Sequence, residues 1–409
     1  MKTLQKIALS ALSLSALVGC GGTGTQNSNS GVNDTDYGDN YDPKNAVVDK
    51  QFIMGMGDLS WSEYSWTNTD WKKTHSLIKN LGVKSVRVWL HSNWIMSNPT
   101  TYNKKGLALG REIVESHLAN NMQIIGMNHS NFHKGGFKNS SSTTAKPSRD
   151  LSEGSYYLTW LEDYRTTWYN LVKAFPEISY WEIDNEDNND VFFGRLEGGS
   201  FSLKEKADIY TDMLYYASKG IHEANPNALT VLGGMVLSGA ETFLQYIYDN
   251  IASGDFGSAY PDDYFQVANW HPYMDNFNKK LFLETNNGIY DIIKKNEKKD
   301  KKVFFTEMGF STGNVSLKRI TDFIPQLYQI AKDDLPYLES VHYFRMYDAL
   351  DSTWGSSAEK GYGLFSDPNS HGVENENPLL ASPKTSAYAY QETAKGEGSL
   401  TVYQEVANP

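Results

Sequence analysis

The chain has 409 residues, of which 13% are aromatic and 21% charged, and its formal net charge is −12. This composition is sufficient for a sizeable buried core and excludes a largely disordered protein. The negative charge is spread along the chain without a long basic block. Because phosphate backbones bind to positive surfaces, nucleic acid is an unsuitable partner.

The first residues predict an export signal. Lys2 and Lys6 precede an apolar stretch, residues 7–19, that is too short to span a bilayer. It runs into Leu17-Val18-Gly19-Cys20, which resembles the lipobox of bacterial lipoproteins, where the cysteine is lipidated and becomes the new first residue. Cys20 is also the only cysteine, so a disulfide within the chain is excluded. We therefore predict a signal peptide at residues 1–19 and a lipid anchor on Cys20, with ordinary cleavage and secretion as the alternative.

The anchor implies an exported protein attached to the bacterial cell envelope. Gly21, in place of Asp, follows the cysteine, which resembles outer-membrane sorting if the host is Gram-negative. Residues 20–45 are rich in Gly, Ser, Thr, Asn and Asp and predict a flexible tether with a reach of roughly 25–30 Å. Residues 46–409 are expected to form one domain.

After the tether, strand-like and helix-like stretches alternate eight times. The strand-like stretches are short and rich in Val, Ile, Phe, Tyr and Trp. They are apolar enough to be buried on both faces, as in a parallel sheet. Their predicted bounds are residues 52–57, 83–91, 122–128, 178–186, 229–234, 264–271, 302–308 and 339–347.

The intervening stretches show helical periodicity. Apolar residues in 203–221 recur at steps of four and three and stop before an Asn-Pro pair. A second helix runs from residue 71 and ends at Gly82, and a third covers 158–175. A last helix is predicted near 382–395, with Pro383 at its first position. Eight such units favour a closed (β/α)8 barrel over a doubly wound sheet, since no Gly-rich phosphate-binding turn opens a helix.

Three connections at the carboxyl ends of the predicted strands are long, namely residues 130–154, 187–202 and 348–382. The loops at this end of a barrel build its active site. Their length therefore indicates a site shaped for an extended ligand.

Glutamates end two of the predicted strands. Residues 180–186 (YWEIDNE) place Glu186 at the end of the fourth strand, and residues 303–309 (VFFTEMG) place Glu307 at the end of the seventh. A carboxylate beside buried apolar residues is costly unless it has partners or a function. The two glutamates lie 121 residues and so three strand–helix units apart, which favours a function for both.

With these motifs the chain resembles the retaining clan-A (β/α)8 glycoside hydrolases, and within the clan it is most similar to families 39 and 5. Asn185-Glu186 matches the clan's Asn-Glu pair, and Glu307 in Thr-Glu-Met-Gly matches the nucleophile strand. Arg87 matches the arginine of the second strand, and residues 271–273 (HPY) match the His-x-Tyr of the sixth. The resemblance covers roughly residues 52–395, which is nearly the whole predicted mature chain.

The resemblance implies double displacement on the β-linked sugars of a polysaccharide or oligosaccharide, with no cofactor. Glu186 would be the acid/base and Glu307 the nucleophile. Arg87 would keep Glu307 charged, and Tyr273 would donate a hydrogen bond to it. Asn185 would bind the sugar 2-hydroxyl. A retaining mechanism predicts a separation of about 5–5.5 Å between the two carboxyl groups.

Further residues near the predicted strand ends are candidates for substrate contact, with alternatives open. His271 is expected to position its neighbours rather than transfer protons. Asn128 and His129 are either substrate contacts or members of a structural polar layer. Arg87 could instead serve only as an interior salt-bridge partner, and Glu182 is expected to be an interior structural acid.

The sequence departs from the clan pattern in two places. Asp187 stands where proline commonly follows the Asn-Glu pair, and it opens an acidic run to Asp190. The eighth predicted strand lacks the tryptophan that usually floors the first sugar subsite, so Tyr347 or Trp354 is expected to take that position. Other tryptophans that could stack on sugar rings are Trp61, Trp66, Trp89 and Trp94. These departures bear on which substrate is expected, and they do not change the expected reaction.

Two other functions remain open at this point. His91, His129 and His271 end predicted strands, which would suit a metal-dependent hydrolase on the same barrel. Against this, the first strand offers only one carboxylate, Asp58. A non-catalytic polysaccharide-binding lipoprotein would keep the aromatic residues but would have no need for both glutamates.

Overall fold

The computed structural model describes residues 52–57, 64, 71–133, 143–348, 359–366 and 381–396. The predicted signal peptide, Cys20, the tether, and the tryptophans Trp61, Trp66 and Trp354 lie outside these residues. In the described part, no helix combines the length and the hydropathy that crossing a membrane would require.

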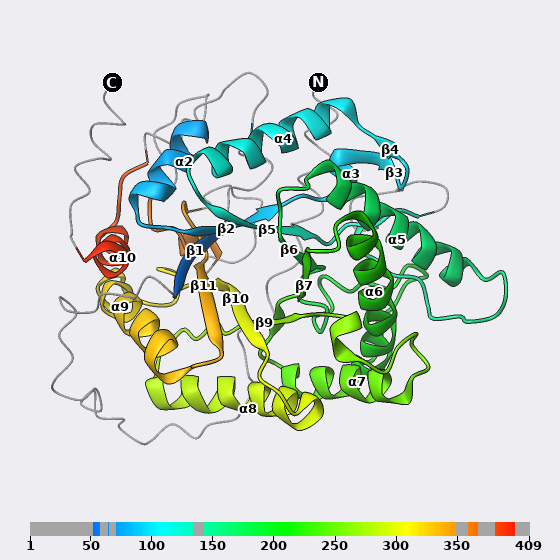
Figure 1. Cartoon of the computed structure of the whole chain (residues 1–409). Helices are drawn as coiled ribbons and strands as arrows, with labels where there is room; N and C mark the ends of the chain where they lie inside the picture. Colours follow the sequence, from blue (N-terminus) through cyan, green and yellow to red (C-terminus); the bar gives the residue numbers. More distant parts are fainter. Residues whose placement is uncertain are drawn as a thin grey trace.

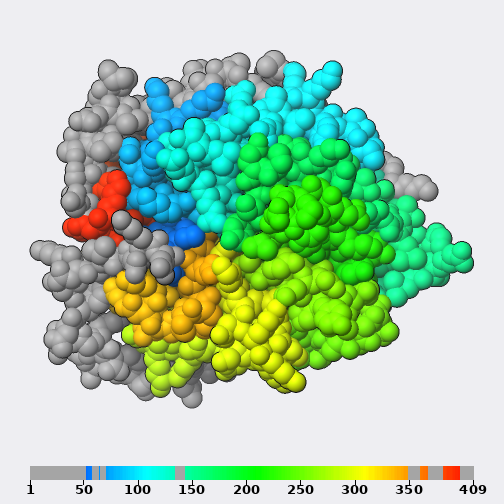
Figure 2. Space-filling model, in the orientation of Figure 1, coloured from blue at the N-terminus to red at the C-terminus, as the bar shows by residue number. Residues whose placement is uncertain are grey.

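Eight parallel strands form a closed barrel (Figure 1). In order around the barrel they are β1 (Ile53–Gly57), β2 (Ser85–Trp89), β5 (Gln123–Asn128), β6 (Tyr180–Ile183), β7 (Leu229–Leu232), β9 (Val267–His271), β10 (Lys302–Met308) and β11 (Leu338–Tyr343). Closure occurs where β1 pairs with β11, with Ile53 opposite Ser340. Figure 2 shows blue and orange atoms, from segments near the two ends of the barrel sequence, in contact on one face. The predicted (β/α)8 architecture is confirmed.

Helices follow the strands and surround the barrel (Figure 1). The long helices are α2 (Trp71–Asn80), α4 (Lys104–Ala119), α5 (Tyr156–Ala174), α6 (Leu203–Ala224), α7 (Ala240–Ser253), α8 (Lys279–Glu297), α9 (Leu317–Asp334) and α10 (Thr385–Lys395). The short elements are α3 (Ser92–Ile95), β3 (Met96–Asn98), β4 (Thr101–Tyr102), β8 (Met235–Val236), η4 (Pro261–Asp263) and η5 (Glu359–Gly361).

Local sequence signals account for several helix ends. Ser202 and Glu205 form a capping box that satisfies backbone N–H groups at the start of α6. Gly82, with φ of 93°, follows the end of α2, as predicted. The predicted start of the last helix is wrong. Pro383 pairs with Phe365 in a short extended bridge, so α10 begins only at Thr385.

The barrel interior holds an apolar layer and a polar layer. Tyr180 of β6 and Phe304 of β10 lie edge to face with ring centroids 5.2 Å apart. These strands are not neighbours, so the contact crosses the interior. Ile125, Val231 and Val267 complete this apolar layer. The polar layer contains Arg87, Glu182 and Thr306, with Glu182 accepting hydrogen bonds from the other two.

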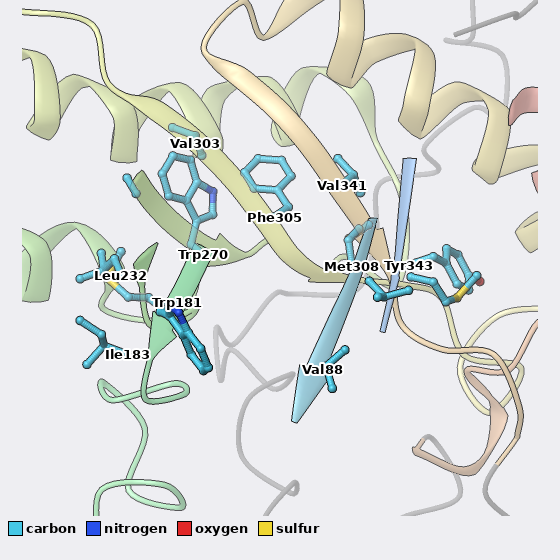
Figure 3. Packing of buried hydrophobic residues seen from close by; sticks show 14 of the residues in the cluster. Val88, Trp181, Ile183, Leu232, Trp270, Val303, Phe305, Met308, Val341 and Tyr343 are labelled. Carbon is cyan, nitrogen blue, oxygen red and sulfur yellow. The ribbon is translucent and has the colours of Figure 1, made fainter. Parts of the chain in front are cut away.

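The outward faces of the strands bury large side chains against the helices (Figure 3). Trp181 and Ile183 alternate with Glu182, which points into the barrel, so they point outward. Trp181 is fully buried, and Gly126 on the neighbouring strand leaves space for it. A Cβ at Gly126 would lie 2.7 Å from the Trp181 ring.

The eighth strand is shorter than predicted, because β11 ends at Tyr343 rather than at Tyr347. Tyr347 is fully buried, and its hydroxyl lies 3.2 Å from Thr74 Oγ1 on α2. Its ring therefore has no surface to offer a sugar, and the structure contradicts the expectation that Tyr347 floors a subsite.

Candidate active site

Arg87 of β2 lies at the centre of the polar contacts in the barrel. Its Nε and Nη2 each donate to a Glu182 oxygen at 2.7 Å, a bidentate contact with β6. Its Nη1 donates to Glu307 of β10, and its Nη2 also donates to Asn185 Oδ1 at 2.6 Å. Arg87 is therefore both an interior salt-bridge partner and a contact of Glu307. Glu182 is fully buried in this network, as expected of an interior structural acid.

Glu307 reaches this network because β10 is irregular. Between Phe305 and Met308 the pairing with β11 shifts, so that three steps on β10 match two on its neighbour. Such a bulge allows two consecutive side chains to face the same side. Thr306 accordingly donates to Glu182 at 3.1 Å, while the next side chain, that of Glu307, also points inward.

Glu186 lies just beyond β6 on a segment with an uncommon backbone. Asp184 and Glu186 have φ of 69° and 51°, in the left-handed region that side chains other than glycine seldom adopt. The Glu186 amide donates to Gly234 O at 2.8 Å, and the Asn185 amide donates to Asp184 Oδ1 at 3.0 Å. The strand therefore ends at Ile183, three residues earlier than predicted.

The two glutamates meet at the carboxyl ends of the strands. A carboxylate oxygen of Glu186, one of Glu307 and a ring nitrogen of His271 all lie within 4.8 Å of one another. Retaining glycosidases have about 5–5.5 Å between their carboxyl groups, whereas inverting ones have about 6.5–9.5 Å. The side chains of Glu186 and Glu307 keep exposed fractions of 13% and 10%, so both remain accessible. The geometry fits the retaining arrangement.

The surroundings of Glu307 favour its ionised form. Burial alone would raise the pKa of Glu307, but the charges of His271 and Arg87 outweigh it and hold the pKa below its ordinary value. Tyr273 assists by donating to Glu307 Oε2 at 2.9 Å. Burial and the charge of Glu307 raise the pKa of Tyr273 well above its usual range, so its hydroxyl keeps the proton that it donates.

His271 connects Glu186 to the barrel interior. Its Nδ1 lies 3.0 Å from Glu186 Oε1, and its Nε2 lies 3.1 Å from Thr306 Oγ1. Gly234 makes this placement possible, because a Cβ there would lie 1.9 Å from His271 Nε2. These contacts fit the positioning role expected of His271.

His91 and His129, at the ends of β2 and β5, form a stacked pair. Their ring centroids are 4.2 Å apart at 13°, and Trp94 meets His91 edge-on at 4.2 Å. Burial, assisted by the charge of Arg87, lowers the pKa of His91 to about 3, so its ring is neutral. The pair therefore forms an uncharged aromatic wall beside the polar network.

Asn128 holds the adjoining loops. Its Oδ1 accepts from the amides of Ser92 at 2.8 Å and Ser130 at 3.2 Å, and its Nδ2 donates to Ser130 O at 3.2 Å. The side chain is fully buried. Of the two alternatives left open by the sequence, its contacts support the structural one rather than substrate contact.

Two aromatic residues near Glu307 were not predicted from the sequence as site residues. Phe344 follows β11 directly, is half-buried, and has its ring centroid 6.4 Å from that of Tyr273. Tyr362 lies 5.5 Å from Tyr273 and 5.7 Å from Phe344 by the same measure. An aromatic residue directly after the eighth strand was the available signal. Extending that strand to Tyr347 obscured it.

Within the described ranges, one group of acidic and histidine side chains is compact enough to hold a metal ion, and it consists of Glu186, His271 and Glu307. The metal-dependent alternative relied on His91 and His129 together with His271. The first two stack on each other and are not members of this group, so the geometry does not favour that alternative.

A closed barrel with two carboxyl groups at this separation is the arrangement typical of retaining glycoside hydrolases. Comparison of the sequence with family models identifies the family. Residues 47–336 match the family model described as cellulase, glycosyl hydrolase family 5, and the chain belongs to that family. No curated protein matches the chain.

Solved structures share the fold. A family 39 glycoside hydrolase from Bacteroides cellulosilyticus has a TM-score of 0.58 and 14% identity over 85% of this chain and 64% of its own. The present chain thus spans just under two thirds of that neighbour. A β-glucosidase from Thermotoga maritima has a TM-score of 0.58 and 14% identity over 87% and 100%. A broad-specificity endoglucanase from Clostridium acetobutylicum has a TM-score of 0.57 and 14% identity over 83% and 96%. At such identities the likeness establishes the fold alone.

Proposed function

We propose that the protein hydrolyses a β-linked polysaccharide or oligosaccharide by double displacement. In the first step Glu307 attacks the anomeric carbon and forms a glycosyl-enzyme, while Glu186 gives its proton to the departing oxygen. In the second step Glu186 takes a proton from water, whose oxygen then displaces Glu307 and releases the sugar with its configuration retained. The observation that carries this proposal is the approach of the two carboxyl groups to within 4.8 Å.

Unequal partners support the assignment of the two roles. Glu307 accepts from the Arg87 guanidinium and from the Tyr273 hydroxyl, which suits a carboxylate that must be ionised to attack. Glu186 contacts His271 at 3.0 Å and Asn189 Nδ2 at 3.5 Å, with no cationic guanidinium among these contacts. The contacts with Arg87 and Tyr273 thus favour Glu307 as the nucleophile and leave the proton transfers to Glu186.

Two neighbouring residues are suited to hold the sugar. Asn185 turns its Oδ1 towards Arg87, which leaves the Nδ2 as the donor for a 2-hydroxyl. Phe344, in place of Tyr347, is half-buried beside Tyr273 and offers a ring face to the sugar.

The long connections from β5 to α5 and from β6 to α6 favour an extended glycan as the substrate. We also propose that the protein is exported and lipid-anchored through Cys20 to the cell envelope, at the outer membrane if the host is Gram-negative. Residues 17–20 and the composition of residues 20–45 support this placement.

A turnover assay separates this proposal from a non-catalytic glycan-binding protein. The wild type and Glu307→Ala are incubated with β-glucans, β-mannans and β-xylans, and released sugar is followed by NMR of the anomeric protons. We expect the wild type to release the β-anomer first and Glu307→Ala to release none. Equal glycan binding without sugar release by either protein would favour the binding function. An α-anomer formed first would indicate inversion.

A further inference from the structure

The acidic run after the Asn-Glu pair has no part in the chemistry above, yet its first carboxyl group is buried. Asp187 is 1% exposed, and its two side-chain oxygens have no hydrogen-bond partner in the part of the chain that the structure describes. Gly233 makes room for it, since a Cβ there would lie 2.9 Å from Asp187 Oδ2. Burial of a carboxyl group without hydrogen bonds is costly, so its placement calls for a physical reason.

Lys146, from the connection between β5 and α5, offsets part of this cost, together with Tyr210 and Lys206. Its Nζ lies 2.8 Å from Asp184 Oδ2 and 3.8 Å from Asp187 Oδ1. These two residues flank Asn185 and Glu186 on either side. The side chain of Lys146 is fully buried. One cation therefore contacts both ends of the four-residue segment that presents the acid/base.

Lys146 is itself held by the loop that follows this segment. Its Nζ donates to Phe192 O at 3.0 Å and lies 4.7 Å from the centroid of the Phe193 ring. Its amide donates to Gly194 O, and its carbonyl accepts from the Leu196 amide, both at 2.8 Å. The ammonium group is thus fixed by contacts on two sides.

Burial and the charge of Lys146 act in opposite directions on the two carboxyl groups of this cluster. Burial raises the pKa of Asp184 to about 6, although Lys146 opposes the change. Burial and the charge of Asp184 raise the pKa of Asp187 well above its ordinary value. Lys146 opposes this rise at both carboxyl groups, so its charge offsets part of the cost of burying the cluster next to the active site.

We propose that Lys146 is a positioning residue for the reaction: by tying Asp184 and Asp187, it holds the bend that presents Glu186 to the departing oxygen. Asp184 and Glu186 both have left-handed φ, a conformation that persists only where the surroundings fix it. This inference rests on the acid/base role proposed for Glu186.

The test compares leaving groups, because protonation by a general acid matters most when the leaving group is poor. Substrates are the phenyl and 2,4-dinitrophenyl β-glycosides of the sugar that the wild type releases. For Lys146→Met we expect kcat/KM to fall about 10- to 100-fold with the phenyl glycoside, a part of the roughly 10²- to 10⁴-fold that general acid catalysis contributes. With the dinitrophenyl glycoside we expect a loss below about 3-fold.

Lys301 offers a matched control. It is also buried, donates to Phe265 O at 2.7 Å and lies 4.4 Å from the Phe265 ring, and it pairs with Glu297 at 2.8 Å. It precedes β10 at the amino end of the barrel, opposite the active site. Lys301→Met should lower the melting temperature but leave the ratio of the two kcat/KM values at its wild-type level.

A second variant separates positioning from stability. Lys146→Met leaves Asp184 without its cation, whereas Lys146→Met/Asp184→Asn removes that charge and should recover part of the melting temperature. We expect the selective loss with the phenyl glycoside to persist in the double variant. Equal losses on both substrates in Lys146→Met, or a double variant with wild-type kinetics, would overturn the positioning role.

Glu186→Gln serves as the benchmark in the same series and should lose activity mainly with the phenyl glycoside. If it shows no such selectivity, the role proposed for Glu186 fails, and the inference on Lys146 fails with it. If Glu186→Gln is selective and Lys146→Met is not, only the inference on Lys146 is refuted.

Discussion

Single residues set the different behaviour of the two glutamates. Glu307 is ionised because Arg87, His271 and Tyr273 surround it with positive charge and a donated hydrogen bond. A folded-state pKa below the unfolded one means that the ionised form contributes stability above the unfolded pKa. That contribution is lost as the pH falls through the folded pKa. The same group must be ionised to attack, so the acidic limb of the pH profile reports on it.

Tyr273→Phe tests this account because it removes the hydrogen bond to Glu307 and keeps the ring. Loss of the donor raises the pKa of Glu307, so the acidic limb of the kcat/KM profile should move to higher pH. The expected displacement is about half to one pH unit, as a hydrogen bond contributes about 0.5–1.5 kcal/mol.

Tyr248→Phe is the control for this substitution. Its hydroxyl donates to Glu297 at 2.6 Å, a similar tyrosine–glutamate contact outside the polar network of the active site. Its pH profile should coincide with that of the wild type. An acidic limb that stays in place in Tyr273→Phe would show that the hydroxyl does not stabilise the Glu307 carboxylate.

Irregularities in individual strands position the two glutamates, and these irregularities could not be predicted from the sequence. Glutamates at the ends of the fourth and seventh strands were predictable from apolar runs that stop at an acid. The bulge at Thr306 and Glu307 was not, because strict alternation would point one of the two side chains outward. The left-handed bend at Asp184 was also missed, since it depends on contacts with a distant loop.

Close packing between strands predicts the effect of a single methyl group. Gly234→Ala would place a Cβ 1.9 Å from His271 Nε2 and so displace the imidazole from Glu186. We expect kcat to fall about 100-fold, the usual cost of a misplacement of about 1 Å in an active site. Gly194→Ala is the control, because a Cβ there meets no atom within 4 Å. Similar kcat values for the two variants would contradict the positioning role of His271.

The overall architecture was the most predictable feature, because a chain with eight alternating strands and helices commonly folds into a closed barrel. Errors arose where the chain leaves regular structure. Beyond Tyr343 it departs from the sheet, so Phe344 lies beside Tyr273 and Tyr347 is buried against α2. Pro383 lies in an extended bridge rather than in the last helix. Periodicity carries no information about these segments, since tertiary contacts determine their course.

At the same scale, the lipid anchor proposed for the N-terminus is testable in cells. Cys20→Ser should abolish incorporation of labelled palmitate and move the protein from the membrane fraction to the soluble fraction. The activity of the released barrel should be unchanged, because the substitution lies 26 residues before the start of the predicted domain at residue 46. Palmitate incorporation equal to that of the wild type would refute lipidation at this cysteine.

The central claim is that Glu307 forms the covalent bond to the sugar while Glu186, within 4.8 Å of it, handles the proton. A 2-deoxy-2-fluoro-β-glycosyl fluoride of the sugar that the protein releases should trap the glycosyl-enzyme, and peptide mass spectrometry then locates the label. We predict a label on Glu307 in the wild type and none in Glu307→Ala. A label on Glu186 or on a residue outside the barrel, or inactivation without any covalent adduct, would contradict the account.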